Sequence, residues 1–398
     1  MACTPTPFPS PRVPDPVPRE MRNGAPVKRD GLEPAGVYRP RRRKTPQMRS
    51  PDYVQLSTAA AITLGLIPGQ MHRCKCTGCL NLLITYPEGC RANCAYCGLA
   101  RHREAKENYA DRNFIRVDWP AAPLIEIIDR VSDMRGATAF QRMCISMITN
   151  PNSDRDAKTI LENWMARIPR EQIPVSILSN PTTMNRRDVR DLHDLGADIF
   201  TVALDACTPA IFEQTRGKGV DSPHSWNTYW SVLEFAREIF GVDRVGMHLI
   251  VGLGETDFDV LKICADLVNL GCHSHLFCFY PEHGSLMDQT PAPSRARWRR
   301  IQLARYLLEY TGHPFEALGF GGDGELLRFG MAEPQLTAIV NTGLPFRTSG
   351  CPGKERPDIS ACDRPYGDSP PSDIASYPFQ PNGGDLRRIR RQLGGPPT

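Results

Sequence analysis

The chain has 398 residues, a formal net charge of +4 and 14 cysteines. This length fits one large α/β domain with tails, or two smaller domains. The mild charge does not indicate nucleic-acid binding, and we expect none. No signal-peptide pattern or membrane-length apolar run occurs, so we expect no membrane association and a cytoplasmic location. A reducing cytoplasm keeps cysteines as thiols, which excludes a disulfide framework and leaves metal binding open.

Residues 1–50 are rich in proline and arginine and have no periodic apolar pattern. Lys and Arg outnumber Asp and Glu there by 11 to 4. Such a segment buries too little apolar surface to offset its ordering entropy, so we expect a disordered basic tail. Its basic run, 39–44, also suits contact with RNA or an acidic partner, as an alternative to a solvated tail.

Residues 51–89 are expected to form an N-terminal extension. Residues 57–65 predict a short helix, with a serine cap at its start and a glycine at its end. Residues 80–86 are apolar and predict the first strand. Between these two segments lies a CxCxxC triplet, which consists of Cys74, Cys76 and Cys79.

Strand-like and helical segments alternate over residues 90–345. This alternation predicts an α/β fold with a parallel sheet and crossover helices, closed as a partial or full (β/α) barrel of about six to eight units. The expected strands are 142–148, 175–178, 199–204, 244–251 and 274–280. The expected helices are 124–131, 155–168, 186–195, 226–240, 257–270 and 294–311.

Polar residues gather where these strands end. In barrels of this kind, the active site lies on the loops that follow the carboxyl ends of the strands. The sequence therefore predicts a site built from several loops. The polar residues at the strand ends are Asn150, Asn152, Asn180, Asp205, 252–255 and 280–283.

The C-terminal part divides into two segments. Residues 346–366 carry Cys351 and Cys362 and are expected to form a C-terminal cysteine segment. Residues 367–398 are rich in proline, glycine and serine and end in a basic run. We expect this last segment to be a disordered tail.

Three more cysteines follow the first expected strand directly, in the run Cys90-Arg-Ala-Asn-Cys94-Ala-Tyr96-Cys97. Three thiolates on one short loop can hold three irons of a cubane cluster and leave the fourth iron open to a substrate or cofactor. Zinc is the alternative, but structural zinc sites use four ligands, commonly in paired Cys-x-x-Cys knuckles. The spacing therefore favours an iron–sulfur cluster that takes part in chemistry.

This CxxxCxxC pattern, with an aromatic residue before the last cysteine, resembles the radical S-adenosylmethionine (SAM) superfamily. The resemblance implies a radical SAM barrel and a [4Fe-4S] cluster on Cys90, Cys94 and Cys97, which would be the catalytic centre. In that family the open iron chelates SAM, and one electron cleaves SAM to a 5′-deoxyadenosyl radical. The radical then removes a hydrogen atom from an unactivated carbon.

Other segments are similar to the same family. The run 248–255 resembles the strand-five motif that packs against the adenine, and the main chain near Tyr96 is implied to contact the adenine too. Asp205 lies where the family often contacts the ribose or methionine, and Arg216 is implied to meet the SAM carboxylate. The alternative for the last two is an ordinary surface ion pair. The implied SAM-binding positions are Tyr96, Asp205, Arg216, Ile250, Gly252 and Glu255.

The second group of cysteines suggests an auxiliary iron–sulfur cluster. An exposed thiol is a liability unless it serves as a ligand, and the CxCxxC spacing would leave one of its thiols in solvent. The alternative is that these cysteines bind nothing or reach a partner. The proposed ligands are Cys74, Cys76, Cys79, Cys351 and Cys362, with Ser349 as a further candidate. Four others in apolar patterns are expected to be buried small hydrophobes: Cys144, Cys264, Cys272 and Cys278.

The combination of motifs resembles the biotin synthase and lipoyl synthase group, and most nearly the two-component lipoyl synthase type. That resemblance implies sulfur insertion into an octanoyl chain on a carrier-protein lysine, with sulfide from the auxiliary cluster. The implied partners are a ferredoxin or flavodoxin type electron donor, a lipoyl-carrier protein and a second synthase subunit. One alternative is a radical SAM enzyme that acts on an amino acid, a tetrapyrrole or a metallocofactor precursor without inserting sulfur. Another is a non-catalytic iron–sulfur or RNA-binding protein.

Overall fold

The computed structural model describes six stretches of the chain. Residues 1–47 of the expected tail lie outside these stretches, and so do Cys76 and the side chain of Cys74. Residues 48–50, which we expected to be disordered, are ordered: the Ser50 side chain is buried and its backbone N–H donates to the Thr85 carbonyl. The described residues are 48–74, 77–103, 118–134, 140–355, 359–362 and 372–394.

One sheet of eight strands organises the fold, in the order β3-β1-β2-β4-β5-β6-β7-β8. Strands β2 and β4 to β8 run parallel, whereas β1 and β3 add an antiparallel edge. In the described part of the chain no pairing joins β3 to β8, so the predicted (β/α) barrel is partial. The strands are β1 (Tyr53–Leu56), β2 (Cys79–Ile84), β3 (Ala121–Pro123), β4 (Arg142–Ser146), β5 (Val175–Ser179), β6 (Ile199–Asp205), β7 (Val245–Val251) and β8 (His273–Cys278).

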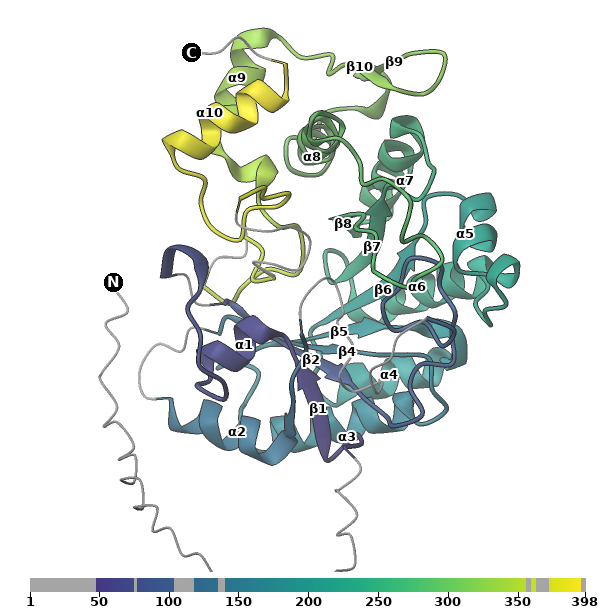
Figure 1. Ribbon diagram of the computed structural model, residues 1–398, viewed down its shortest axis with the longest axis vertical. Coiled ribbons are helices and arrows are strands. Elements are labelled where there is room, and N and C mark those ends of the chain that lie inside the picture. The colour runs from purple at the N-terminus through teal and green to yellow at the C-terminus, as the bar shows by residue number, and fades with distance from the viewer. Residues whose placement is uncertain are drawn as a thin grey trace, which may run out of the picture. The chain divides into compact units, whose positions relative to one another are not determined.

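Helices alternate with the parallel strands and pack along the outside of the sheet (Figure 1). Every helix expected from the sequence is present, within three residues of its predicted ends. Among the described residues, none is long and apolar enough to cross a membrane. The helices are α1 (Thr58–Thr63), α2 (Leu124–Asp133), α3 (Ser153–Met165), α4 (Arg186–Asp194), α5 (Pro209–Thr215), α6 (Trp226–Phe240), α7 (Asp257–Asn269), α8 (Arg295–Tyr310), α9 (Glu333–Thr342) and α10 (Gly383–Gln392).

The local sequence explains why these elements begin where they do. Every residue of β2 is buried, as expected for a strand that is covered on both faces of a parallel sheet. Helix α7 begins with a capping box, in which Thr256 and Asp259 bond each other's backbone N–H. The short helix α5, which we did not predict, begins with a Thr208 cap and a proline in its first turn. Because the main strands are parallel, their carboxyl ends open onto the same side.

The expectation of a disordered tail over residues 367–398 is wrong for residues 372–394. This stretch ends in α10, which packs against α8 and α9 (Figure 1). The apolar residues Leu386, Ile389 and Leu393 recur at helical spacing, a pattern that the overall composition of the segment masks, and they help to close a second small core. Its fully buried members come from four segments: Leu303, Val340, Phe346, Ile374, Tyr377 and Ile389.

The variant Asp385→Ala should release α10 from the rest of the fold. The carboxylate accepts hydrogen bonds from Arg73 at 2.7 and 2.8 Å, and another from the Asn382 backbone N–H at 2.9 Å. Loss of this cap and ion pair should cost about 1.4 kcal/mol, which makes the amides of α10 exchange with deuterium roughly tenfold faster. Arg387→Ala, on the exposed face of α10, is the control. Equal exchange rates in the two variants would contradict the anchoring role.

Candidate active site

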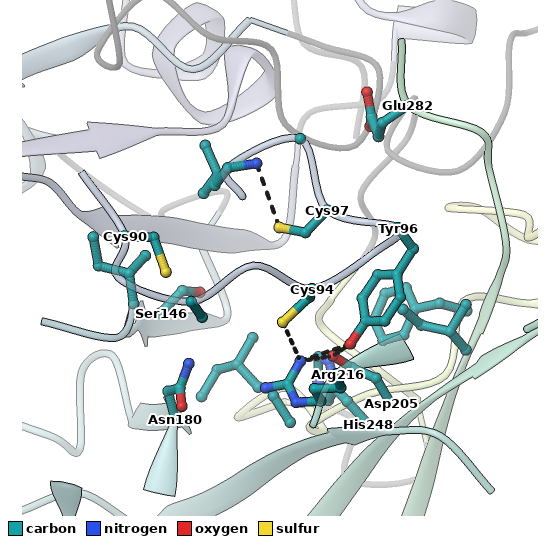
Figure 2. A pocket seen from close by; sticks show the side chains of 18 of the residues that line it. Cys90, Cys94, Tyr96, Cys97, Ser146, Asn180, Asp205, Arg216, His248 and Glu282 are labelled. Atoms are coloured by element: carbon teal, nitrogen blue, oxygen red, sulfur yellow. Dashed lines mark hydrogen bonds and ion pairs between the residues drawn. The ribbon is translucent and has the colours of Figure 1, made fainter. Parts of the chain in front are cut away.

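The loop that follows β2 brings Cys90, Cys94 and Cys97 to one pocket (Figure 2). Cys94 is buried, and the other two side chains are partly buried. The loop is attached to α5 by a backbone hydrogen bond of 2.7 Å from Ala95 to the Thr215 carbonyl. A second one, of 3.0 Å, joins the Met287 N–H to the Ala95 carbonyl. The three thiols therefore stand on a loop that neighbouring segments hold in place.

The rest of the pocket is lined by the carboxyl halves of the parallel strands and by segments that follow them. Of the predicted strand-end residues, Asn180, Asp205, Tyr280 and Glu282 line it, whereas Asn150, Asn152 and residues 252–255 do not. Most of its wall is apolar, and polar groups stand at a few positions only. The apolar lining includes Leu83, Ile148, Leu178, Ala203, Ile250 and Phe277. The polar lining includes Ser146, Asn180, Asp205, Arg216, His248 and Glu282.

Asp205 and Arg216 form a buried ion pair in the pocket wall. Arg216 Nη1 donates to Asp205 Oδ2 and, at 2.6 Å, to the Tyr96 hydroxyl, which in turn donates to Asp205 Oδ2 at 2.6 Å. The exposed fractions are only 8% for Asp205 and 4% for Arg216. The alternative of a surface ion pair is therefore wrong. Three residues that the sequence singled out separately meet at one point.

The backbone of β6 turns Asp205 toward this point. The pairing of β6 with β7 shifts between Ala203 and Asp205, as in a β-bulge. Asp205 also adopts a left-handed conformation, with φ of 67°, which aspartate tolerates better than most residues. Such strain persists only where the surrounding contacts hold it, and the buried pair with Arg216 is that contact.

Four residues support the ion pair, directly or through Tyr229, and sequence reasoning missed three of them: Tyr229, His224 and Thr182. Tyr229 from α6 accepts a hydrogen bond from Arg216 Nη2 at 3.1 Å and donates to Asn180 Oδ1 at 2.6 Å. His224 Nδ1 lies 3.0 Å from the Tyr229 hydroxyl and also contacts Thr182 Oγ1. Of these, only Asn180 was noted, as a strand-end residue. Tyr229 occupies one position in an amphipathic helix, so nothing in its local pattern marks it.

Gly252 and Glu255 lie at the end of β7, outside the pocket wall. The Glu255 carboxylate accepts from the backbone N–H groups of Gly252 and Leu253, at 2.7 and 2.9 Å, and pairs with Arg297 at 3.0 Å. Gly252 has φ of 118°, and a Cβ there would lie 2.6 Å from Pro293. Both residues therefore shape the loop after β7, whereas Ile250 lines the pocket. The contact of Gly252, Glu255 and Ile250 with SAM stays a prediction.

Residues 84–267 match the family described as the Radical SAM superfamily. The match begins at the end of β2 and contains the cysteine loop, Asp205, Arg216 and the loop after β7. The chain contains a radical SAM domain. Comparison with curated proteins gave no match.

Several solved structures are similar to parts of the chain. Methylornithine synthase (PylB) is 13% identical, with a TM-score of 0.39, over 58% of this chain and 60% of that one. The FeFe-hydrogenase maturase HydG from Carboxydothermus hydrogenoformans is 18% identical, with a TM-score of 0.43, over 58% and 51%. Coproporphyrinogen III oxidase (HemN) from Escherichia coli is 14% identical, with a TM-score of 0.34, over 52% and 46%. The chain thus spans about half to three-fifths of the length of each of these structures.

A radical SAM domain implies a [4Fe-4S] cluster and SAM, and the three thiols of the loop fit the cluster. All three are free. The Leu99 backbone N–H donates to Cys97 Sγ at 3.4 Å, and Arg216 Nη1 to Cys94 Sγ at 3.6 Å (Figure 2). Nowhere in the described stretches do three His, Cys, Asp or Glu side chains converge on a single metal ion. A cluster does not need such convergence, because each thiolate binds a different iron.

Burial raises the pKa of the Cys94 thiol to about 11, although Arg216 acts in the opposite direction. It also raises the pKa of the Cys97 thiol well above its usual range. Iron binding must therefore displace protons from these two cysteines, as it does when thiolates become metal ligands. The nearby N–H donors and the guanidinium stabilise the thiolate form once iron is bound.

A second set of thiols lies at the opposite, amino-terminal ends of the strands. Cys79 is the first residue of β2 and pairs in register with Arg142, the first residue of β4. Cys79 and Cys351 both interact electrostatically with the Arg142 guanidinium, which also pairs with Asp198. All three cysteines of this set, Cys79, Cys351 and Cys362, are at most 9% exposed.

Residues 351–353 pair with residues 359–361, so that Cys351 and Cys362 become neighbours. The Ala361 N–H donates to the Cys351 carbonyl at 2.8 Å, and Pro352 pairs with Ser360. Ser349 uses its hydroxyl for the backbone of Leu276, which gives it another role than the ligand role suggested by the sequence. The expected burial of Cys264, Cys272 and Cys278 is confirmed, whereas Cys144 is partly exposed.

His224→Asn should weaken the dependence of stability on pH. Burial, with help from Arg216, lowers the pKa of His224 to about 2. Below pH 6.5 the unfolded chain therefore binds a proton that the folded chain does not, and stability falls as pH falls. Between pH 6 and 4, the free energy of unfolding should therefore fall more steeply in the wild type than in the variant. The difference in slope should be up to about 1.4 kcal/mol per pH unit.

Urea unfolding of the metal-free chain at several pH values measures this difference. His193→Asn, at an exposed histidine on α4, is the control and should keep the wild-type dependence. Parallel curves for the wild type and His224→Asn would contradict a neutral buried imidazole.

Proposed function

We propose that the chain is a radical SAM enzyme that inserts sulfur into an unactivated C–H bond and uses an auxiliary iron–sulfur cluster as the sulfur source. The observation that carries the proposal is the presence of two thiol sets at opposite ends of the parallel strands. One set, Cys90, Cys94 and Cys97, lines the pocket of the radical SAM domain. The other set lies at the far end, where Cys79 and Cys351 interact with Arg142 and Cys362 lies beside Cys351.

When bound, the cluster and SAM supply a 5′-deoxyadenosyl radical, and the auxiliary cluster supplies sulfide. The chain's own residues bind, orient and exclude water. The apolar strand residues around the pocket keep water from a reactive radical. Asp205, Arg216 and Tyr96 present fixed polar groups at the carboxyl ends of the strands, where the ribose and carboxylate of SAM would be held.

The apolar lining of the pocket supports an aliphatic substrate. Leu178, Ile250 and Phe277 offer contact area to a hydrocarbon chain and no partner for a charged one. This agrees with an octanoyl chain carried on a lysine of a lipoyl-carrier protein. The proposed partners are that carrier protein, a second synthase subunit and an electron donor of the ferredoxin or flavodoxin type.

The buried Arg142 supports metal binding by the second thiol set. Its pairing with Asp198 keeps the guanidinium charged despite burial. Burial raises the pKa of the Cys351 thiol, and the charge of Arg142 offsets part of that rise. Cys74 and Cys76 complete the proposed ligand set from the sequence. The alternative function, a radical SAM enzyme that does not insert sulfur, would leave this gathering of cysteines without a sulfur-donating role.

SAM cleavage tests the radical chemistry. After anaerobic reconstitution with iron and sulfide, SAM and a reductant should give 5′-deoxyadenosine, measured by mass spectrometry. Cys94→Ala should lower the yield at least 100-fold, because a cluster ligand is lost. Cys264→Ala, at a buried cysteine outside both sets, should keep the wild-type yield. With an octanoylated peptide as substrate, a thiolated product supports sulfur insertion, whereas 5′-deoxyadenosine without thiolation, with the partner subunit present, favours the alternative.

Iron analysis tests the auxiliary cluster. The reconstituted wild type should hold about eight irons, and the double variant Cys351→Ala/Cys362→Ala about four, because one [4Fe-4S] cluster is lost. The triple variant Cys74→Ala/Cys76→Ala/Cys79→Ala should lose the same number, and Cys264→Ala none. An unchanged iron content in both multiple variants would contradict an auxiliary cluster at this end of the strands.

A further inference from the structure

Arg216 points a charged N–H group at a sulfur atom of the cluster loop. Its Nη1 lies 3.6 Å from Cys94 Sγ, a hydrogen-bond distance for sulfur (Figure 2). The same nitrogen also contacts Asp205 and Tyr96, so its two N–H groups serve three acceptors. The arginine comes from the end of α5, 122 residues from the cysteine along the chain. A positive charge is thus built into the wall at one ligand of the cluster.

Several contacts fix the guanidinium in this place. Asp205 and Tyr96 hold the Nη1 edge, and the Tyr229 hydroxyl accepts from Nη2 at 3.1 Å. The Arg216 Cζ atom also lies 5.1 Å from the centre of the Tyr229 ring. Tyr229 is fully buried, and its hydroxyl donates to Asn180 Oδ1 at 2.6 Å. Contacts within the protein thus hold both edges of the guanidinium and place its charge beside Cys94.

The ion pair with Asp205 does not by itself explain this placement. A buried pair needs no sulfur contact, and burial of charges without further purpose costs stability. Arg216 Nε is buried and has no hydrogen-bond acceptor among the described residues, so the side chain tolerates an orphaned donor in this position. Beyond the ion pair and the two tyrosines, the remaining contact of the guanidinium is with the Cys94 sulfur.

Reduction adds a negative charge to an iron–sulfur cluster, and its potential depends on nearby charge, hydrogen bonds to the sulfurs and exposure to solvent. In a buried site with a low dielectric constant, a cation beside one ligand stabilises the reduced form. The Asp205 carboxylate offsets part of this effect, but Arg216 is the partner that contacts the sulfur. We propose that Arg216 raises the reduction potential of the cluster on Cys90, Cys94 and Cys97, and that Tyr229 is the positioning residue that holds Arg216 at Cys94. This inference rests on the proposed cluster and goes beyond its role in SAM cleavage.

An EPR-monitored redox titration without SAM tests the proposal, because a role only in SAM binding would leave the potential unchanged. In Arg216→Gln, the ratio of reduced to oxidised cluster at a given ambient potential should fall about tenfold, which is about 59 mV for one electron. Tyr229→Phe should shift the potential in the same direction by less. Arg237→Gln removes the same charge from the outer helix α6 and should leave the potential unchanged.

Two further variants keep the test decisive. The Cys94→Ala variant identifies which EPR signal belongs to this cluster, because that signal should be lost. Arg216→Gln leaves Asp205 without a compensating charge and could fail to fold for that reason. The double variant Arg216→Gln/Asp205→Asn removes both charges, and its cluster should have a lower reduction potential than the cluster of Asp205→Asn. An intact cluster with the wild-type potential in these variants overturns the inference alone. A wild type that assembles no cluster overturns the proposed function and the inference together.

Discussion

The guanidinium of Arg216 is the contact on which the site depends. It joins the cysteine loop through Cys94 and Tyr96, strand β6 through Asp205, and helix α6 through Tyr229. A planar group with five N–H donors can hold several acceptors in one fixed geometry, which a lysine cannot do. Removal of its charge would leave Asp205 buried without compensation, and such a loss is costly. This one side chain therefore ties the cysteine loop to the conformation of Asp205, in addition to the backbone hydrogen bonds that hold the loop.

The direction of the strands separates the two thiol sets. Because β2 and β4 to β8 are parallel, a residue that begins a strand lies at one end of the sheet and a loop that follows a strand lies at the other. Cys79 and the loop from Cys90 to Cys97 flank the same strand, yet they open to opposite ends. The radical SAM domain therefore has a pocket at its carboxyl end and a second group of thiols at its amino end, with strand side chains between them.

The expectation that residues 367–398 are disordered shows a limit of composition-based reasoning. Many proline, glycine and serine residues indicate disorder when no apolar surface is available to bury. Ile374, Tyr377 and Ile389 nevertheless find such a surface on α8 and α9. Ile389 shares helical spacing with Leu386 and Leu393, but the surface that these residues cover is assembled from other parts of the chain, and composition alone does not show it.

The sequence by itself determined the elements and the first cluster loop. Periodic apolar runs specify strands and helices locally, and three cysteines within eight residues must share one loop wherever that loop lies. Only the tertiary structure decided what surrounds the loop. The contacts of Arg216 with Cys94, of Cys79 and Cys351 with Arg142, and of Tyr229 with Asn180 join residues far apart in sequence. Each depends on how several elements pack against one another, and no local pattern encodes that packing.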